Sequence, residues 1–431
     1  MMTITELQQR YAAHPNVEAM SGLLKNPSVR TLFCGGLCAS AASLFSSVLV
    51  QRGEFPFVFI LGDLEEAGYF YHDLTQVLGT DKVLFFPSSF RRAIKYGQKD
   101  AANEILRTEV LSRLQKGEEG LCVVTYPDAL AEKVVSRKEL GDKTLKLHSG
   151  ENVDTNFIME VLRSYGFEYV DYVYEPGQYA VRGSIIDVFS FSSEFPYRID
   201  FFGDEVESIR TFEVETQLSK EKKDSIVIVP DLSRSLEQGG ASGMVSFLDF
   251  LSADTVLAMR DLLWLRERIQ TVHDETLTPQ AIAAREAEES GCITLDGKLI
   301  DGSEFTLRAL DFRRMEFGNK PTGTPDATIT FDTSAQPIFR KNFDMVAESF
   351  KEYMEKGYAL YICSDSMKQT DRIRAIFEDR GDQIAFTAVE RTLHEGFADN
   401  ALRLCIFTDH QLFDRFHKYN LKSCLLYTSD A

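Results

Sequence analysis

The chain has 431 residues, of which 44% are hydrophobic, so it is long enough for two to four domains and too long for one ordinary core. Its 66 acidic residues outnumber the 47 basic ones, and the net charge of −19 argues against tight, non-specific binding of duplex nucleic acid by this chain. Because the sequence has neither a leader-like segment nor a run of 18 apolar residues, it predicts a cytoplasmic protein without a membrane span, and we expect a monomer.

The first 137 residues alternate strand-like and helix-like segments. Short apolar runs at 31–36, 57–61, 82–87 and 121–125 have the composition of strands that are buried on both faces. A helix is expected at 99–115, where apolar residues recur at helical spacing. This pattern predicts a multidomain α/β protein whose first domain (1–137) is a doubly wound parallel sheet.

A second unit is predicted at 138–228. Asp154 or Thr155 should cap a helix, and strands should follow at 169–174, 178–189, 197–202 and 205–214. Pro176-Gly177 and Gly203-Asp204 supply the turn chemistry between these runs. The unit should be a small α+β domain.

The remaining chain divides into three parts. In the third stretch (229–335) we expect helices at 256–272 and 278–290. The fourth (336–423) returns to α/β alternation and predicts a separate small α/β domain, with helices at 343–356 and 366–380 and strands at 358–364, 384–389 and 402–408. Residues 424–431 match a translated sequencing adapter, so we interpret them as an artefact and expect a longer natural protein.

The first strand-to-helix turn lies where a phosphate-binding loop would be expected. Against the pattern G-x-x-x-x-G-K-(S/T), Gly36 and Ser43 fit, but Ala41 replaces the second glycine and Ala42 replaces the lysine. A bound phosphate would lose its counter-charge. The sequence therefore predicts a degenerate nucleotide loop without function and no bound cofactor. The alternative interpretation is a helix start rich in small residues that packs against its sheet.

Side chains for metal binding or covalent catalysis lack the usual spacing. The seven cysteines are scattered without C-x-x-C pairs, and the seven histidines show no H-E-x-x-H spacing, although His410 and His417 lie seven apart beside Asp409 and Asp414. No G-x-S-x-G elbow is present. We expect no metal site and no catalytic residue, and a polar helix face is the simplest interpretation of the two histidines.

The most specific pattern lies in two runs, at 175–189 and 196–210. Alternation along the second run should place Tyr197, Ile199 and Phe201 on one side of a sheet, and Arg198, Asp200 and Phe202 on the other. One interpretation is a solvated face on which Arg and Asp pair across strands. The other is a docking surface, because Arg and aromatic residues are common interface anchors.

The charge around these runs points to the kind of partner. Between residues 151 and 215 there are 14 acidic residues and four arginines, so this stretch holds about half of the net charge. A basic protein suits it better than nucleic acid does.

The two runs resemble domain 2 of the excision-repair protein UvrB and, more closely, the matching domain of bacterial transcription-repair coupling factors. The shared order is R-G-x-(I/L)-(I/L)-D-(V/I)-F followed by P-Y-R-(I/L)-(D/E)-F-F-x-D-E-(V/I)-(D/E)-S-(I/L)-R. The resemblance implies a UvrB-like first domain with a degenerate P-loop, an inserted domain 2, a returning half at 229–335, and a small domain of unclear role at 336–423.

In that family domain 2 binds UvrA, so the resemblance implies a UvrA-docking surface. The residues expected to form it are Tyr179, Arg182, Asp187, Phe189, Arg198, Asp200, Phe202, Asp204, Glu205, Glu207 and Arg210. We expect Arg182, Arg198 and Phe202 to lie on one continuous patch ringed by Asp200, Asp204, Glu205 and Glu207.

Two departures bear on activity. UvrB has a tyrosine-rich hairpin that probes damaged DNA, whereas the corresponding region at 87–102 has only Tyr96. Relative to a full coupling factor, the chain lacks the polymerase-binding domain, the ATP- and magnesium-dependent translocase and the C-terminal domain. The resemblance thus implies a UvrA-recruiting adaptor that is not itself an enzyme, from a parent that displaces stalled RNA polymerase on duplex DNA. The alternatives are a UvrB-like protein that binds ATP and damaged DNA, and a DNA-binding module.

Overall fold

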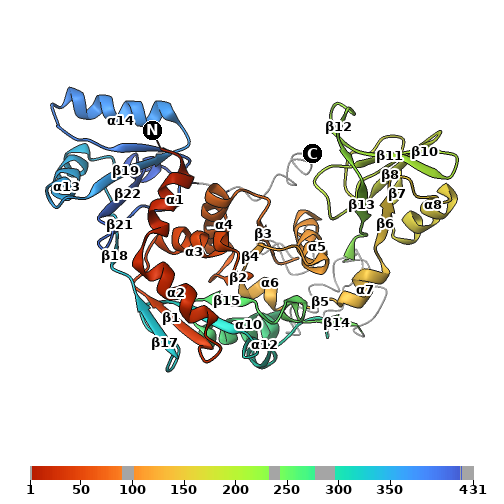
Figure 1. Ribbon diagram of the computed structural model, residues 1–431, viewed down its shortest axis with the longest axis horizontal. Coiled ribbons are helices and arrows are strands. Elements are labelled where there is room, and N and C mark those ends of the chain that lie inside the picture. Colours follow the sequence, from red (N-terminus) through yellow and green to blue (C-terminus); the bar gives the residue numbers. More distant parts are fainter. Residues whose placement is uncertain (1, 90–100, 233–242, 277–296, 418, 420–431) are drawn as a thin grey trace.

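A computed structural model describes residues 2–89, 101–232, 243–276, 297–417 and 419. In Figure 1 a central α/β unit lies between a β-rich unit on one side, residues 145–228, and a smaller α/β unit on the other, residues 333–412. Among the described helices, none is long and apolar enough to cross a bilayer. The predicted helix at 278–290, Tyr96 and the adapter-like segment 424–431 lie outside the described residues.

The central unit is organised around a sheet of seven parallel strands: β1 (Thr31–Gly35), β2 (Phe57–Ile60), β3 (Val83–Phe85), β4 (Cys122–Thr125), β15 (Val256–Met259), β16 (Arg313–Gly318) and β17 (Ala327–Thr330). Their order is β17-β1-β16-β15-β2-β4-β3. The four strands expected before residue 137 and their parallel pairing are confirmed. Strands from beyond residue 255 complete the same sheet.

The helices and short elements of the central unit connect and cover these strands: α1 (Ile4–Ala12), α2 (Pro15–Lys25), α3 (Ala41–Arg52), α4 (Leu64–Leu78), α5 (Ala101–Lys116), α6 (Pro127–Leu130), β5 (Val134–Val135), α7 (Arg137–Asp142), β14 (Met244–Val245), η1 (Phe247–Phe250), α10 (Leu262–Thr276) and α12 (Gly302–Ala309). Side chains accept backbone hydrogen bonds at several helix starts, such as Thr3 before α1, Asp63 before α4 and Asp301 before α12.

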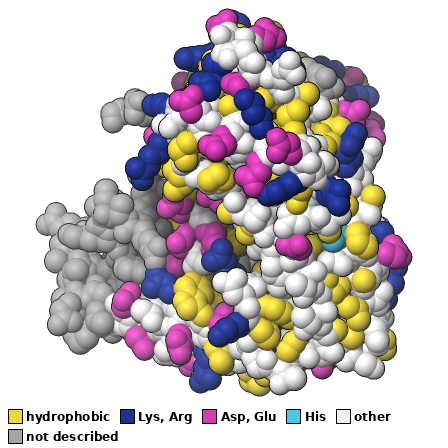
Figure 2. Space-filling model, turned by 90° about the vertical axis from the view of Figure 1, so that its left-hand side faces the viewer, with side chains coloured by type: hydrophobic (Ala, Val, Ile, Leu, Met, Phe, Trp, Pro, Cys, Tyr) yellow, Lys and Arg dark blue, Asp and Glu magenta, His cyan; other side chains and the backbone are white. Residues whose placement is uncertain are grey.

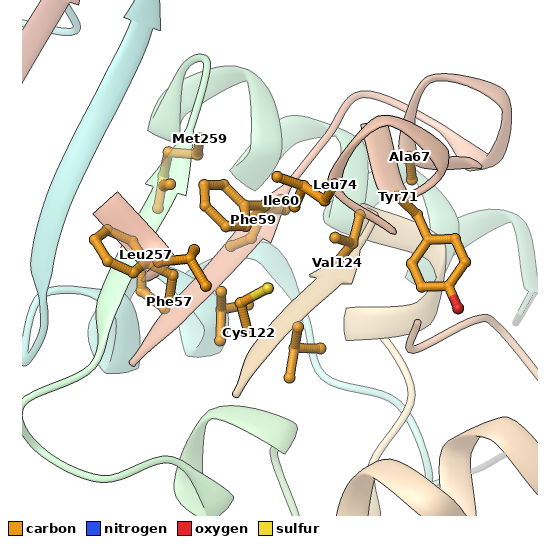
Figure 3. Packing of buried hydrophobic residues seen from close by; sticks show 14 of the residues in the cluster. Phe57, Phe59, Ile60, Ala67, Tyr71, Leu74, Cys122, Val124, Leu257 and Met259 are labelled. Atoms are coloured by element: carbon orange, nitrogen blue, oxygen red, sulfur yellow. The ribbon is translucent and has the colours of Figure 1, made fainter. Parts of the chain in front are cut away.

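The core of the central unit is apolar on both faces of the sheet. Figure 3 shows side chains from β2, β4 and β15 packed beside Ala67, Tyr71 and Leu74 of α4. The rings of Phe57 and Phe59 stack with their centroids 5.6 Å apart. Complete burial of these strands explains why their sequences read as continuous apolar runs.

The single helix predicted at 256–272 is wrong. Residues 256–259 form β15 between β16 and β2, and a helix begins only at Leu262. The carboxylate of Asp261 accepts hydrogen bonds from the backbone N–H groups of Leu263 and Trp264, at 2.8 and 3.0 Å. This cap separates the strand from the helix and was legible in the sequence.

The β-rich unit contains a six-stranded sheet with the order β12-β11-β10-β9-β8-β7. Its strands are β7 (Glu168–Tyr169), β8 (Gln178–Arg182), β9 (Ile185–Val188), β10 (Tyr197–Phe202), β11 (Glu205–Phe212) and β12 (Ser219–Lys223). Helix α8 (Thr155–Ser164) packs on one face, which we call the inner face, and a two-stranded ribbon of β6 (Leu145–His148) and β13 (Ser225–Ile228) contributes to the same core. Asp154 caps α8 as predicted.

Two predicted strands of this unit need correction. The strand expected at 178–189 is the hairpin of β8 and β9, because Gly183 adopts a positive φ of 64° at the turn. The strand expected at 169–174 ends after Tyr169, because residues 170–174 cross the other face of the sheet. Side chains there make hydrogen bonds that a neighbouring strand would otherwise make. Gln178 accepts hydrogen bonds from the backbone of Tyr174 and Glu175, and Gln217 donates one to the carbonyl of Val173.

The smaller α/β unit has a five-stranded mixed sheet with the order β18-β21-β22-β19-β20. Its elements are β18 (Thr333–Ala335), α13 (Phe343–Glu355), β19 (Ala359–Ser364), α14 (Met367–Asp379), β20 (Thr387–Glu390), β21 (Phe397–Asp399), β22 (Leu404–Thr408) and α15 (Asp409–Leu412). The predicted alternation is confirmed, although β20 begins three residues later than expected. Figure 2 views the molecule from this side and shows acidic and basic side chains intermixed on the described surface.

The smaller α/β unit is joined tightly to the central unit. Leu393 and Phe397 are fully buried in the central apolar core, and the ring of Phe397 packs edge-on against Tyr11 at 6.2 Å. Backbone hydrogen bonds of 2.9 and 3.0 Å join Met2 to Ala388 and Glu390, on β20. The two units therefore share one hydrophobic core.

Candidate protein-docking site

The outer face of the six-stranded sheet, opposite α8, brings charged residues into one transverse row. In the strand register Asp187 of β9 lies opposite Arg198 of β10, Arg198 opposite Arg210 of β11, and Arg210 opposite Lys222 of β12. The expected alternation along β10 is confirmed, since Ile199 and Phe201 are buried in the core on the inner face. Arg198, Arg210 and Lys222 thus follow Asp187 in one row across this face, although the unit as a whole is acidic.

Asp187 is the centre of this row. Its side chain has no exposed surface, and it accepts two hydrogen bonds from Arg198, at 2.8 Å from Nε and 2.9 Å from Nη2. Arg182 of β8 reaches the same carboxylate through Nη2. These hydrogen bonds to Asp187 raise the pKa of Arg198. A buried carboxylate that two arginines share fixes both guanidinium groups in position.

The two arginines differ in how much they offer to a partner. Arg198 has 18% of its side chain exposed, donates also to the carbonyl of Gln217 at 3.0 Å, and lies with Cζ 4.4 Å from the ring centroid of Phe212. Arg182 has 36% exposed, and its Cζ lies 5.0 Å from the ring centroid of Tyr172. Arg182 is therefore the more available contact, while Arg198 is largely engaged within the unit.

Phe202 lies at the open end of the outer face. It is 77% exposed, and its neighbour across the strands is Glu205 at the start of β11. Asp204, Glu205 and Glu207 are also exposed, and Asp200 is half-buried on β10. An apolar ring presented to solvent beside carboxylates, on the same face of the sheet as two fixed guanidinium groups, is the arrangement of a protein interface anchor with a charged rim.

Three residues predicted for the surface are buried. Tyr179 faces the inner core, where its hydroxyl accepts a hydrogen bond of 3.2 Å from Arg163, so the expectation that it forms part of the docking surface is wrong. Phe189 belongs to a small apolar cluster on the outer face with Val173, Ala180, Phe212 and Val214. Asp187 acts on the surface only through the two arginines.

Sequence analysis also missed residues that complete the outer face. Tyr172 was assigned to a regular strand, and Phe212 and Gln217 were not considered. The run Glu168-Tyr169-Val170-Asp171-Tyr172-Val173-Tyr174-Glu175, in which three tyrosines are interspersed with two valines and acidic residues stand at both ends, was the signal that could have revealed a surface segment.

Comparison with known proteins shows that this face lies in a segment that matches a protein-family model. A family model described as the UvrB interaction domain matches residues 145–233, which include the whole outer face. The chain is 28% identical over 198 residues to the transcription-repair-coupling factor of Escherichia coli (strain K12), and 30% identical over 229 residues to that of Bacillus subtilis (strain 168). These matches cover 46% and 51% of this chain, and 17% and 19% of the relatives.

A longer match covers nearly all of the chain. The transcription-repair-coupling factor of Staphylococcus aureus (strain bovine RF122 / ET3-1) is 21% identical over 454 aligned residues, which cover 90% of this chain and 38% of the relative. The chain is thus similar to transcription-repair coupling factors over 90% of its length, and its residues 145–233 match the UvrB interaction domain. It spans less than two fifths of the length of these curated relatives.

The loop predicted to be a degenerate phosphate loop makes its hydrogen bonds to the chain itself. Ser43 donates to the buried carboxylate of Asp73 at 2.7 Å, and the backbone N–H of His394 donates to the other oxygen of Asp73 at 2.7 Å. Burial raises the pKa of Asp73 to about 6. Ser40 accepts a hydrogen bond of 2.9 Å from the backbone of Glu395. Gly36 is confined too, because a Cβ there would lie 2.0 Å from the carbonyl oxygen of Phe331.

Four histidines, His72, His394, His410 and His417, form a second polar cluster where α4 meets residues 394–417. The rings of His410 and His417 stack at 4.3 Å, that of His72 on α4 lies 4.8 Å from His417, and that of His394 stacks on Tyr69 at 3.5 Å. Burial lowers the pKa of His72, His394 and His417 to about 4. Within the described residues, no group of three or more potential ligands is arranged to hold a metal ion.

Proposed function

We propose that this chain recruits UvrA through the outer face of its six-stranded sheet. The observation that carries the proposal is the exposed Phe202 on the same face of the sheet as Arg182 and Arg198, which share buried Asp187, inside the segment matched as a UvrB interaction domain. UvrA would accept the phenyl ring in an apolar pocket, and an acidic group of UvrA would pair with Arg182. The acidic rim would steer a basic surface of UvrA toward the face.

The chain acts as an adaptor in this proposal and performs no catalysis itself. The ATP-driven translocase, its magnesium and its contacts with duplex DNA and RNA polymerase would belong to the parts of a coupling factor that this chain does not span. Recruitment needs a surface that is fixed before the partner arrives, since ordering side chains on binding lowers affinity. Asp187 provides this, because its carboxylate holds the side chains of Arg182 and Arg198 in position before UvrA binds.

The test compares UvrA binding by the 431-residue chain and by three variants: Arg182→Ala, Arg198→Ala and Phe202→Ala. Truncation of an anchor should weaken binding by about thirtyfold, equivalent to about 2 kcal/mol. Arg198→Ala should also lower the melting temperature, because Arg198 holds Asp187, so Arg182→Ala and Phe202→Ala are the decisive variants. Phe157→Ala is the matched control, since Phe157 is 52% exposed on α8.

Association kinetics test the acidic rim separately. Charge reversal by Glu205→Lys or Glu207→Lys should slow association with UvrA and flatten its salt dependence, with a smaller effect on dissociation. If folded Arg182→Ala and Phe202→Ala both bind UvrA as tightly as the unmodified chain, the outer face is not the docking site.

A further inference from the structure

The segment from Glu168 to Glu175, which we call the strap, crosses the end of the outer face away from Phe202. Val173 is fully buried in the apolar cluster with Phe189 and Phe212, and Val170 packs against that cluster. Tyr172 and Tyr174 flank the buried valine and are 50% and 51% exposed. Residues on either side of an inward side chain in an extended segment point the other way, so the strap presents both rings to solvent.

The strap is held in place by several hydrogen bonds. Its backbone is bonded at Val170 to the carbonyl of Tyr179, at 2.9 Å, and at Tyr174 and Glu175 to the side chain of Gln178, at 2.9 and 3.0 Å. Fixed tyrosines bury a large area on binding at a small entropic cost, since each has only two side-chain torsions. The strap is thus pre-organised to contact a partner.

Tyr172 connects the strap to the docking surface. The Cζ of Arg182 lies 5.0 Å from its ring centroid, and the same guanidinium is bonded to Asp187. A partner group that pairs with Arg182 therefore comes close to the Tyr172 ring. Glu168, Asp171 and Glu175 are exposed around the tyrosines and give the strap a negative charge.

We propose that the strap is a second contact area for UvrA, on which Tyr174 and the face of the Tyr172 ring turned away from Arg182 receive lysine or arginine side chains from a basic part of its surface. The inference rests on the proposed function and extends it by naming the contact and the chemistry. A cation over a tyrosine ring is stabilised by the ring quadrupole, and the neighbouring carboxylates add to the attraction. The docking surface then reaches from Phe202 across Arg182 to the strap.

The test measures UvrA affinity for Tyr172→Ala, Tyr174→Ala and Tyr172→Phe in the 431-residue chain. We expect about a tenfold loss for Tyr172→Ala, a smaller loss for Tyr174→Ala, and nearly unchanged binding for Tyr172→Phe, which keeps the ring. The matched control is Tyr169→Ala, because Tyr169 is 58% exposed on the same strap but its ring packs against Tyr179. Melting temperatures identify variants that have lost the fold.

The outcomes separate this inference from the proposed function. If Arg182→Ala weakens UvrA binding while folded Tyr172→Ala and Tyr174→Ala bind like the unmodified chain, the strap inference is overturned and the outer-face proposal stands. Equal losses for Tyr172→Ala and Tyr169→Ala would also overturn it, since they would indicate a general effect of the strap. An unmodified chain that does not bind UvrA overturns both.

Discussion

Asp187 is a carboxylate without solvent contact whose charge is balanced by two guanidinium groups from neighbouring strands. Replacing it by Asn leaves Arg182 and Arg198 close together without their counter-charge. Removing one partner of a buried ion pair typically costs 3–5 kcal/mol, and because these arginines are partly exposed we expect a loss of about 3 kcal/mol for Asp187→Asn. Urea unfolding measures this difference.

The control for this residue is Asp204→Asn at the exposed turn between β10 and β11, where we expect a change within about 0.5 kcal/mol. An Asp187→Asn variant as stable as the Asp204→Asn variant would show that the shared carboxylate does not order the face. The sequence predicted the Arg and Asp pairing across strands. It did not predict that the same pairing would hold two arginines on the proposed docking surface, so the two interpretations of the face are compatible.

At the scale of elements, the joint between α4 and residues 394–417 should respond to acid. The buried imidazoles of His72, His394 and His417 have pKa values of about 4, below the ordinary 6.5, and burial also lowers the pKa of His410. The unfolded chain then binds more protons between pH 6.5 and 4, so these groups destabilise the fold as pH falls through that window. Asp73, with its raised pKa of about 6, and Asp409, whose pKa burial also raises, act in the opposite direction but are fewer than the four histidines.

The His72→Phe variant tests this pH dependence. His72 is 8% exposed, and phenylalanine keeps an aromatic ring beside His417 while removing the titration. Between pH 6.5 and 5 the variant should lose about 1 to 2 kcal/mol less stability than the unmodified chain. Urea unfolding at a series of pH values gives the comparison, and identical pH profiles would contradict this account of the joint.

Local sequence signals predicted most strands and helices but not their partners. Asp154 before α8 and the apolar runs of β1 to β4 were sufficient, because a cap or a buried strand is encoded within a few residues. The strand at Val256–Met259 was missed because a short, fully buried apolar run shows no strand-like alternation that would distinguish it from the helix that follows. The strap was missed because the side chains that hold it, Gln178 and Gln217, are chosen by tertiary contact.

At the scale of the whole molecule, residues more than 300 positions away in the sequence form hydrogen bonds at and near the degenerate loop. His394 and Glu395 of the smaller unit donate to Asp73 and Ser40 of the central unit, and the hydroxyl of Tyr69 donates to the carbonyl of His417 at 2.9 Å. The sequence showed that the loop lacks its lysine. It could not show that another unit bonds to the loop, because no local pattern encodes the pairing.

These contacts predict that repairing the motif will not restore nucleotide binding. The unmodified chain should bind no ATP up to millimolar concentration, and the double variant Ala41→Gly/Ala42→Lys should bind none either, because the buried Asp73 carboxylate and the bonded Glu395 backbone remain at the loop. Calorimetry with Mg-ATP measures both. Saturable binding by the unmodified chain would favour a UvrB-like ATP-binding protein, and binding by the double variant alone would show that the missing lysine is the sole obstacle.

The central claim is that UvrA covers the outer face, and side-chain footprinting of the complex by hydroxyl radicals tests it most directly. Phe202, 77% exposed, and Phe157, 52% exposed on α8, should both be oxidised in the free chain. When UvrA is added to saturation, oxidation of Phe202 should fall several-fold while that of Phe157 stays unchanged. Oxidation of Phe202 at the same rate in the saturated complex as in the free chain would contradict the claim.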